Sequence, residues 1–418
     1  MRRLLVCKWD RDFMTLLKKE DIEVYLVVDQ YECDHCDVDL SMADVAYKIS
    51  SFNSLEELMS IVVDLREKKI TIDKVVNFIE HGQLGASLLK HFIEKDSNIL
   101  EKTLTARDKR LMKAVARSVG VTVARSCSVA DLDTELSSAT AVLGYPFILK
   151  PAYGIGAYST YKIKDHAELN KIVSDLKTNG LPGFLSSQHF IAEEFINGEE
   201  FHIDAIWKNG QEIIFSISRY FCPRIGAGNR NLNGSIVLPE SQYESLYREA
   251  REVCLKISRE LDFRNEAVHI EFFIEKNSGK FILSEFATRI AGAAVSDSIE
   301  YAKGSSLHQL LLKSLLGDEN TLDSLNVKNP PHDTRFVGWC NIIPAVSGKI
   351  NKMPEKNFFQ QYKNIFKIQF LQKEGDLVNV DDPSNWCILI VLGADSEQGI
   401  VDTCNQILSD IKFEMIPS

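Results

Sequence analysis

Two glutamates on a predicted β-hairpin, Glu271 and Glu285, have the spacing of a paired carboxylate site. The hairpin strands 269–276 and 280–285 are joined by residues 277–279, which suit a three-residue loop with glycine in the left-handed position. In that register the two glutamates face each other about 5 Å apart, and they repel unless a cation lies between them. The pair therefore predicts Mg²⁺ shared with nucleotide phosphates.

The same register divides the hairpin into two faces. One is expected to be core and the other to carry the site: Ile270, Phe272, Ile274, Ile282 and Phe286 on the first, and His269, Glu271, Phe273, Leu283 and Glu285 on the second. A solvated acidic face, with the register displaced by one residue, is the alternative. Arg289 follows Glu285 by four residues and can stabilise charge on a transferring phosphoryl or acyl group.

A second candidate for anion binding is the glycine-rich segment 144–160, in which Lys150 ends a buried-strand pattern. Glycines allow backbone amides to approach an anion closely, and the lysine adds a point charge suited to a polyphosphate. The segment is not a Walker loop, because no Gly-Lys-Ser/Thr follows at the required spacing. An ordinary hairpin turn is the alternative interpretation.

The first hundred residues must position a further candidate, Glu80. Short β-like runs at 4–7, 23–28 and 74–78 alternate with helical patterns such as 55–67, which follows Ser54. This alternation favours a parallel sheet with flanking helices. Glu80 lies at the carboxyl end of a predicted parallel strand, where α/β folds bind ligands, although an exposed loop glutamate is the alternative.

Beyond residue 100 the pattern is mixed. The predicted elements are a helix over 106–118 capped by Thr105 and ended at Gly120, strands within 144–163 and 190–217, a helix over about 242–261, the hairpin over 267–287, and strands near 336–343 and 387–392. Pro330 and Pro331 mark a predicted boundary. The segment from Arg219 to Arg230 is expected to form a loop whose arginines read a carboxylate substrate, whereas His202, His269 and Cys222 are expected to be structural.

Composition excludes several classes of protein. The 418 residues suggest about three domains, and 48 basic against 59 acidic residues give a net charge of −11, which argues against a nucleic-acid binder. The longest apolar run, near 386–394, is too short to span a membrane. Nine scattered cysteines indicate reduced thiols and a cytoplasmic protein, and the Cys33/Cys36 pair lacks the second pair of a zinc site.

The order of these pieces resembles an ATP-grasp ligase. The segments that carry the resemblance are Lys109, Lys150 with its glycine-rich loop, Ile191 to Glu200, Glu271, and Glu285 to Arg289. The resemblance implies an α/β (α+β) fold with an N-terminal parallel α/β domain over 1–101 and an ATP-grasp domain over 102–330, whose lid spans about 140–215. A C-terminal α+β lobe over 331–418 completes the expected fold.

The resemblance also implies roles for individual residues. Lys109 and Lys150 would contact ATP, and the lid loop containing Gly154, Gly156 and Ser159 would close over its phosphates. The remaining implied contacts are Glu193, Glu194 and Ile196 with adenine, Glu200 with the ribose, Glu271 and Glu285 with Mg²⁺ or Mn²⁺, and Arg289 with the acyl-phosphate centre and the substrate.

One position departs from the common pattern of the family, because Ala287 stands where many members have a metal-binding asparagine. Together with Arg289 to Gly292 and with Val75 to Ala86, this resembles the branch of amino-acid ligases that form dipeptides. In that branch Glu80 would bind a substrate ammonium group. The implied partners are small amino acids or other carboxylates, with a homodimer also suggested by the resemblance.

The expected reaction is ATP-dependent amide formation through an acyl phosphate. Lysines, the metal and Arg289 would offset the charge of phosphoryl transfer, and lid closure would exclude water. Three alternatives remain: a ligase that loads an amino acid onto a carrier protein or serves a specialised natural-product pathway, a carboxylase-type enzyme that activates bicarbonate, and a nucleotide-binding regulatory protein without turnover.

Overall fold

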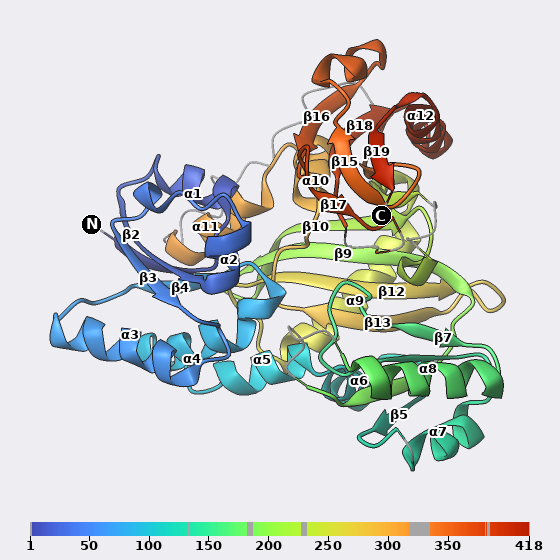
Figure 1. The fold of residues 1–418 in the computed structure, drawn as a ribbon. Helices are drawn as coiled ribbons and strands as arrows, with labels where there is room; N and C mark the ends of the chain where they lie inside the picture. The colour runs from blue at the N-terminus through green and yellow to red at the C-terminus, as the bar shows by residue number, and fades with distance from the viewer. Residues whose placement is uncertain are drawn as a thin grey trace.

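The computed structural model describes residues 2–132, 134–181, 187–226, 232–317, 335–380, 382 and 385–417. Its N-terminal part is a parallel four-stranded sheet with the order β3-β2-β1-β4 (Figure 1). The elements are β1 Arg2–Cys7, α1 Arg11–Leu17, β2 Ile22–Asp29, α2 Gln30–His35, β3 Val45–Ile49, α3 Leu55–Glu67, β4 Lys74–Asn77 and α4 Gln83–Ile93, with short 3-10 turns at Leu40–Met42 and Glu80–Gly82. The predicted parallel sheet is confirmed.

Apolar residues cover both faces of this sheet, as the continuous hydrophobic runs of its strands require. On one face, Leu5, Tyr25 and Val75 pack with Leu58 and Ile61 of α3. On the other face the strands pack against α1 and against α11 (Leu307–Leu316), a helix from much later in the chain that lies beside the N-terminal sheet in Figure 1. The N-terminal unit is therefore fastened to the rest of the molecule through a shared core.

Two helices, and not the single predicted one, connect this unit to the rest of the fold. They are α5 Ile99–Arg107 and α6 Lys109–Ser118. The helical conformation is interrupted at Asp108, whose backbone is extended. The Asp108 side chain accepts a hydrogen bond from the backbone N–H of Arg110, so Asp108 and not Thr105 caps the second helix. The predicted end at Gly120 agrees with its φ of +71° just after the helix. The break matters because it places Lys109 at the first position of α6.

A small antiparallel sheet with two helices forms the lower right of Figure 1. Its elements are β5 Ser126–Val129, α7 Glu135–Leu143, β6 Phe147–Pro151, β7 Tyr161–Ile163, α8 His166–Asn179 and β8 Phe190–Glu194, in the strand order β5-β8-β6-β7. This sheet begins earlier than the predicted lid of about 140–215 and ends earlier too, because the later strands of that range belong to the large sheet.

The large sheet has eight strands in the order β13-β12-β9-β10-β11-β14-β18-β16. Its elements and attached helices are β9 Gly198–Lys208, β10 Gln211–Tyr220, β11 Asn233–Val237, α9 Glu244–Glu260, β12 Ala267–Glu275, β13 Phe281–Ala287, α10 Val295–Lys303, β14 Phe336–Ile342, β16 Ile365–Phe370, β18 Ile388–Ala394 and α12 Glu397–Asp410, with short 3-10 turns at Arg224–Gly226, Glu240–Gln242 and Lys356–Gln361. β15 Gly348–Lys352, β17 Leu377–Val378 and β19 Glu414–Pro417 form a separate small sheet.

This sheet joins the central and C-terminal parts of the chain, since β11 pairs with β14 over its whole length. The boundary predicted at residue 331 lies outside the described residues. The C-terminal strands predicted near 336–343 and 387–392 correspond to β14 and β18. Among the described residues, no helix is both long and apolar enough to cross a membrane, and all nine cysteines are free thiols.

The predicted hairpin is present, and its glutamates face each other, but the path to that register differs from the prediction. The loop has four residues, because Glu275 and Lys280 already bond to each other across it and Gly279 adopts a φ of +68°. A bulge between Glu271 and Phe272 then shifts the pairing by one residue, which restores Glu271 opposite Glu285. Consequently Leu283 lies in the core and Ile282 in the face that was predicted for Leu283.

The cap at Asp108 can be tested by Asp108→Ala. We expect the free energy of unfolding to fall by about 1–2 kcal/mol, because α6 loses a side-chain acceptor for its first turn. Ser54→Ala is the matched control, since Ser54 precedes α3 without a side-chain capping bond and should change stability by less than about 0.5 kcal/mol. Urea unfolding measures both variants, and equal losses would contradict the assignment of the cap.

Candidate active site

A cavity of about 680 Å³ lies between the small sheet and the large one. Of the predicted site residues, those that line it are Glu80, Lys109, Lys150, Gly154, Gly156, Glu193, Glu194, Ile196, Glu200, Glu271, Glu285 and Arg289, whereas Ser159 is not among the lining residues. Its volume falls in the range of small-molecule and cofactor sites. Candidates dispersed over the chain therefore meet in one cavity.

The facing glutamates form the floor of this cavity. Alternation along β12 buries Ile270 and Phe272 beneath the sheet against α9 and turns Glu271 into the cavity. Tyr220 donates from its hydroxyl to Glu271 Oε1 at 2.9 Å, and His269 Nε2 lies 3.5 Å from the same oxygen. Burial acts to raise the pKa of Glu271, but the hydrogen bond and charge of His269 hold it below its usual range. The carboxylate thus stays ionised and oriented.

Glu285 is balanced by two lysines. Its carboxylate lies 2.9 Å from Lys150 Nζ and 3.1 Å from Lys109 Nζ. Burial opposes ionisation here as well, but these two cations hold the pKa of Glu285 well below its usual range. Two ionised carboxylates on neighbouring strands are the hard oxygen ligands that Mg²⁺ prefers, so the donor set fits the metal. Ala287 offers no side-chain oxygen beside them.

A third lysine, which the sequence did not single out, extends this network. Lys113 Nζ lies 3.2 Å from Glu193 Oε1, and Lys150 Nζ lies 3.2 Å from the other oxygen of the same carboxylate. Lys113 follows Lys109 by four residues on α6, a spacing that places both on one helix face and could have revealed it. The cavity wall therefore presents three lysines whose charges are shared among two glutamates.

The residues predicted to hold the nucleoside have mixed surroundings. Ile196 lines the cavity, while the Glu194 side chain is fixed by Arg125, which donates to it from the backbone at 2.8 Å and from Nε at 2.6 Å. Glu200 is buried and accepts from the backbone N–H of Arg224 at 2.6 Å. Burial first, and then the charge of Glu271, raise the pKa of Glu200 to about 8. Their contacts with adenine and ribose remain predictions.

The glycine-rich loop after β6 reaches over the lysines. Lys109 Nζ donates to the carbonyl of Gly154 at 2.8 Å, and the backbone N–H of Lys109 donates to Ala152 at 3.0 Å. Gly156 and the following Ala157 both have positive φ values, of +57° and +63°. The loop is thus held at its base by α6 and has the left-handed backbone that exposes amides toward an anion.

Glu80 holds two arginines together at the edge of the cavity. It follows β4, as predicted, and its two carboxylate oxygens accept from Arg107 and from Arg289. Arg107 also donates to the carbonyl of Tyr153 at 3.0 Å. Although burial opposes ionisation, the two guanidinium groups lower the pKa of Glu80 to about 2. Its predicted role with a substrate ammonium remains a prediction, and its observed contacts orient Arg289.

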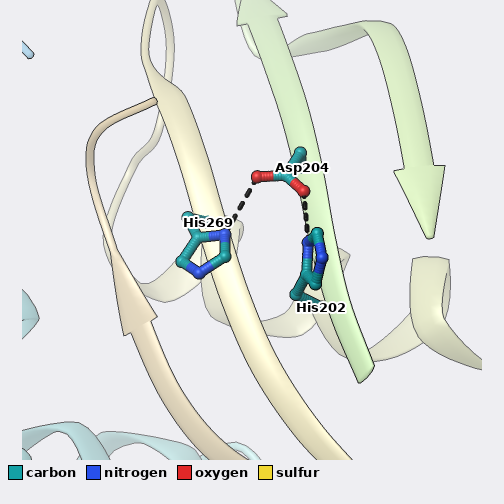
Figure 2. Close-up of side chains that lie close together, drawn as sticks. All are labelled: His202, Asp204 and His269. Atoms are coloured by element: carbon teal, nitrogen blue, oxygen red, sulfur yellow. Dashed lines mark hydrogen bonds and ion pairs between the residues drawn. The ribbon is translucent and has the colours of Figure 1, made fainter. Parts of the chain in front are cut away.

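Three buried polar residues lie beside Glu271 on the paired strands β9 and β12, and Figure 2 shows them. Asp204 on β9 accepts from Nδ1 of His202 at 2.6 Å and from Nδ1 of His269 at 2.9 Å. Their potential metal-binding atoms lie within 4.8 Å of one another, but the Nδ1 atom of each histidine already donates to the carboxylate. Burial opposes protonation of His269, yet Asp204 raises its pKa to about 9. We interpret the group as a support that holds His269 against Glu271.

A family model of the ATP-grasp domain matches residues 143–297. This part of the chain is therefore similar to ATP-grasp domains, and two individual comparisons show that most of the chain is similar to L-amino acid ligases. The L-arginine-specific L-amino acid ligase of Bacillus subtilis is 29% identical over 350 residues, which cover 82% of this chain and 80% of that one. The crystal structure of L-amino acid ligase from Bacillus licheniformis superposes with a TM-score of 0.78, covering 100% of this chain and 99% of that one at 16% identity.

Other proteins share the fold more broadly. The large chain of carbamoyl phosphate synthase from Archaeoglobus fulgidus is 22% identical over 290 residues, 69% of this chain but only 25% of that longer one. The biotin carboxylase domain of 2-oxoglutarate carboxylase from Hydrogenobacter thermophilus, solved as a dimer with MgADP and bicarbonate, superposes with a TM-score of 0.69 at 16% identity and covers 99% of this chain and 91% of that one. The predicted fold class is confirmed by these likenesses.

The pKa of Glu80 makes a prediction about stability. A pKa lowered from 4.5 to about 2 corresponds to about 3 kcal/mol of stabilisation, which is fully present above pH 4.5 and is lost as the pH falls through 2. We therefore expect Glu80→Gln to lower the free energy of unfolding by about 3 kcal/mol at pH 7 and by progressively less as the pH falls from 5 toward 2. Urea unfolding at several pH values measures this.

Glu23→Gln is the control for that experiment. Glu23 pairs with Arg3 at the surface of the same N-terminal unit, where solvent screening limits the pair to about 1 kcal/mol. A Glu80 variant whose stability differed from the unmodified protein by no more than this control would show that the buried pairing with two arginines is not stabilising.

Proposed function

We propose that this protein is an ATP-dependent ligase that joins the carboxyl group of one amino acid to the amino group of another. An acyl phosphate would form from ATP, and the amine would then displace phosphate, with ADP and phosphate as the other products. The observation that carries the proposal is the meeting of Glu271 and Glu285 with Lys109, Lys150 and Arg289 in one cavity. The relation to L-amino acid ligases supports the choice of substrates.

The lysines would bind the phosphates of ATP. Lys109 and Lys150 now neutralise Glu285, and Mg²⁺ on the two glutamates would free both lysines to face the γ-phosphate. When held by Glu271 and Glu285, the metal would supply positive charge that offsets the negative charge developing during phosphoryl transfer. Lys113 would hold Glu193 in place behind them. Because Ala287 supplies no side-chain oxygen, Glu271 and Glu285 are the side chains of this hairpin that would hold the metal.

Arg289 would act at the acyl centre. Glu80 fixes its orientation through a buried ion pair, so the guanidinium group does not have to be ordered again in each reaction cycle. The loop over residues 154–159, anchored by Lys109, would cover the nucleotide and keep water from the acyl phosphate. Positioning and charge stabilisation would thus supply most of the rate enhancement.

The proposed reaction is tested by a two-dimensional screen of carboxyl and amine donors for phosphate release, with the mass of the product read from active pairs. We expect release with particular pairs of L-amino acids and a product mass equal to the pair minus one water. Release that depends on bicarbonate would instead indicate a carboxylase. ATP binding without release for any acyl substrate would indicate a regulatory protein.

The proposed metal site on Glu271 and Glu285 is tested by Glu285→Ala. We expect Mg²⁺-dependent ADP formation to fall by roughly 100-fold or more, because metal binding contributes several kcal/mol to the stabilisation of the transition state. Glu275→Ala, at the end of β12 in the same hairpin and away from the cavity, serves as the control and should retain activity. Full activity of the Glu285 variant would overturn the metal assignment.

The phosphate role of Lys150 has its own test. We expect Lys150→Ala to raise the Kd for ATP by at least about 10-fold, since a charged hydrogen bond to phosphate contributes roughly 1.5–3 kcal/mol. Lys171→Ala, on the exposed face of α8, is the control for a change in net charge. Unaltered ATP affinity in the Lys150 variant, with the fold intact by circular dichroism, would refute the assignment.

A further inference from the structure

The charges that line the cavity are paired unevenly. Around Glu271 and Glu285, most cationic side chains already have a carboxylate partner. Lys109 and Lys150 pair with Glu285. Lys113 pairs with Glu193, and Arg289 pairs with Glu80. Arg224 also lines this part of the cavity, yet within the described ranges its guanidinium has no carboxylate within ion-pair distance. Its side-chain hydrogen bond goes to the neutral amide oxygen of Asn233, at 2.6 Å.

The position of Arg224 is well defined. It begins the short 3-10 turn Arg224–Gly226 after β10, where its backbone N–H donates to Glu200. The guanidinium carbon lies 5.5 Å from the centre of the Tyr220 ring and 5.8 Å from that of Trp386, within the range of cation–π contact. Because the Tyr220 hydroxyl donates to Glu271, the ring of Tyr220 lies between Arg224 and the Glu271 carboxylate.

Such a guanidinium group is suited to a carboxylate. Contact with aromatic rings orients its planar fork, and the fork matches the two oxygens of a carboxylate better than a lysine does. Arg219, from the same segment, does not share this opportunity, because it pairs with Glu199 and Glu397. The segment predicted to bind a carboxylate contains three arginines, and of its described residues Arg224 is the arginine that lines the cavity. Arg230 lies outside the described residues.

We propose that Arg224 binds the α-carboxylate of the amine-donating amino acid, so that this substrate must be an α-amino acid with a free carboxylate. The inference rests on the proposed ligase function. In that reaction the first substrate loses its carboxylate charge when it is activated, whereas the second keeps its charge throughout. Since amine and carboxylate share one α-carbon, a carboxylate bound to Arg224 keeps the amine in the same cavity as Glu271 and Arg289, where the acyl group is proposed to form.

The wall beside Arg224 adds a preference for the side chain of this substrate. Trp386 packs edge-on against Trp339 with ring centres 5.7 Å apart, and both line the cavity together with Val295. Aromatic walls of this kind bury apolar side chains favourably. We therefore expect leucine and phenylalanine to bind better than glycine at this subsite.

The test compares amino acids with their carboxamides, which retain the amine but lack the negative charge. The probes are glycine, L-leucine and L-phenylalanine, each with its carboxamide, as amine donors in the phosphate-release assay and as ligands in titration calorimetry with ADP and Mg²⁺ present. We expect Arg224→Gln to lower kcat/KM and affinity for the free acids at least 10-fold and to change values for the carboxamides less than 3-fold. Arg224→Lys should recover part of the loss.

Arg219→Gln is the matched control, and it should leave discrimination between acids and carboxamides unchanged. Equal losses for acids and carboxamides in the Arg224 variant, or no loss, would overturn the inference. An unmodified protein that binds acids and carboxamides equally, or binds neither, would also overturn it. Calorimetry reads the contact without turnover, so absence of phosphate release in every assay would count against the proposed function alone.

Discussion

Repulsion between Glu271 and Glu285 is the constraint around which the site is organised. The register of β12 and β13 forces the two carboxylates to face each other, and like charges so placed destabilise a sheet unless they are compensated. Compensation comes from segments that the sheet itself does not contain: Lys109 at the start of α6 and Lys150 at the end of β6. The large sheet thus supplies the two carboxylates, and the small sheet and helix α6 supply the lysines that compensate them.

Compensation on the other glutamate is of a different kind. Glu271 is held by Tyr220 and His269, and His269 is held in turn by the buried Asp204. These contacts fix the direction of the carboxylate more than they neutralise it, because the charge of Asp204 offsets that of His269. The two glutamates are therefore not equivalent. Glu285 is neutralised by two buried lysines that come from outside the large sheet, whereas Glu271 is held by side chains of the sheet itself.

Much of this site was predictable where local patterns decide the structure. Alternation along β12, the Gly279 turn and the strand preceding Glu80 are visible in the sequence, so the facing glutamates and the position of Glu80 were predicted. The four-residue loop and the bulge were not, because each changes the register by one residue and their effects cancel at Glu271 while exchanging Ile282 and Leu283.

Pairings between distant segments were the other limit of prediction. Arg107 on Glu80, Tyr220 on Glu271 and Trp386 near Arg224 depend on how whole elements pack, and no periodicity along the chain records this. The break at Asp108 shows the same limit at short range, since a continuous helix and two capped helices have similar apolar patterns.

The eight-stranded sheet contains strands from two parts of the chain, and these parts contribute different residues to the cavity. Every glutamate and lysine that lines the cavity precedes residue 290, whereas Trp339 and Trp386 come from β14 and from the residues just before β18, in the C-terminal part of the chain. A substitution at Trp339 or Trp386 therefore alters the wall beside Arg224 and replaces none of the charged side chains around Glu271 and Glu285. In the evolution of such a chain, the shape of this wall and the charged cluster can change independently of each other.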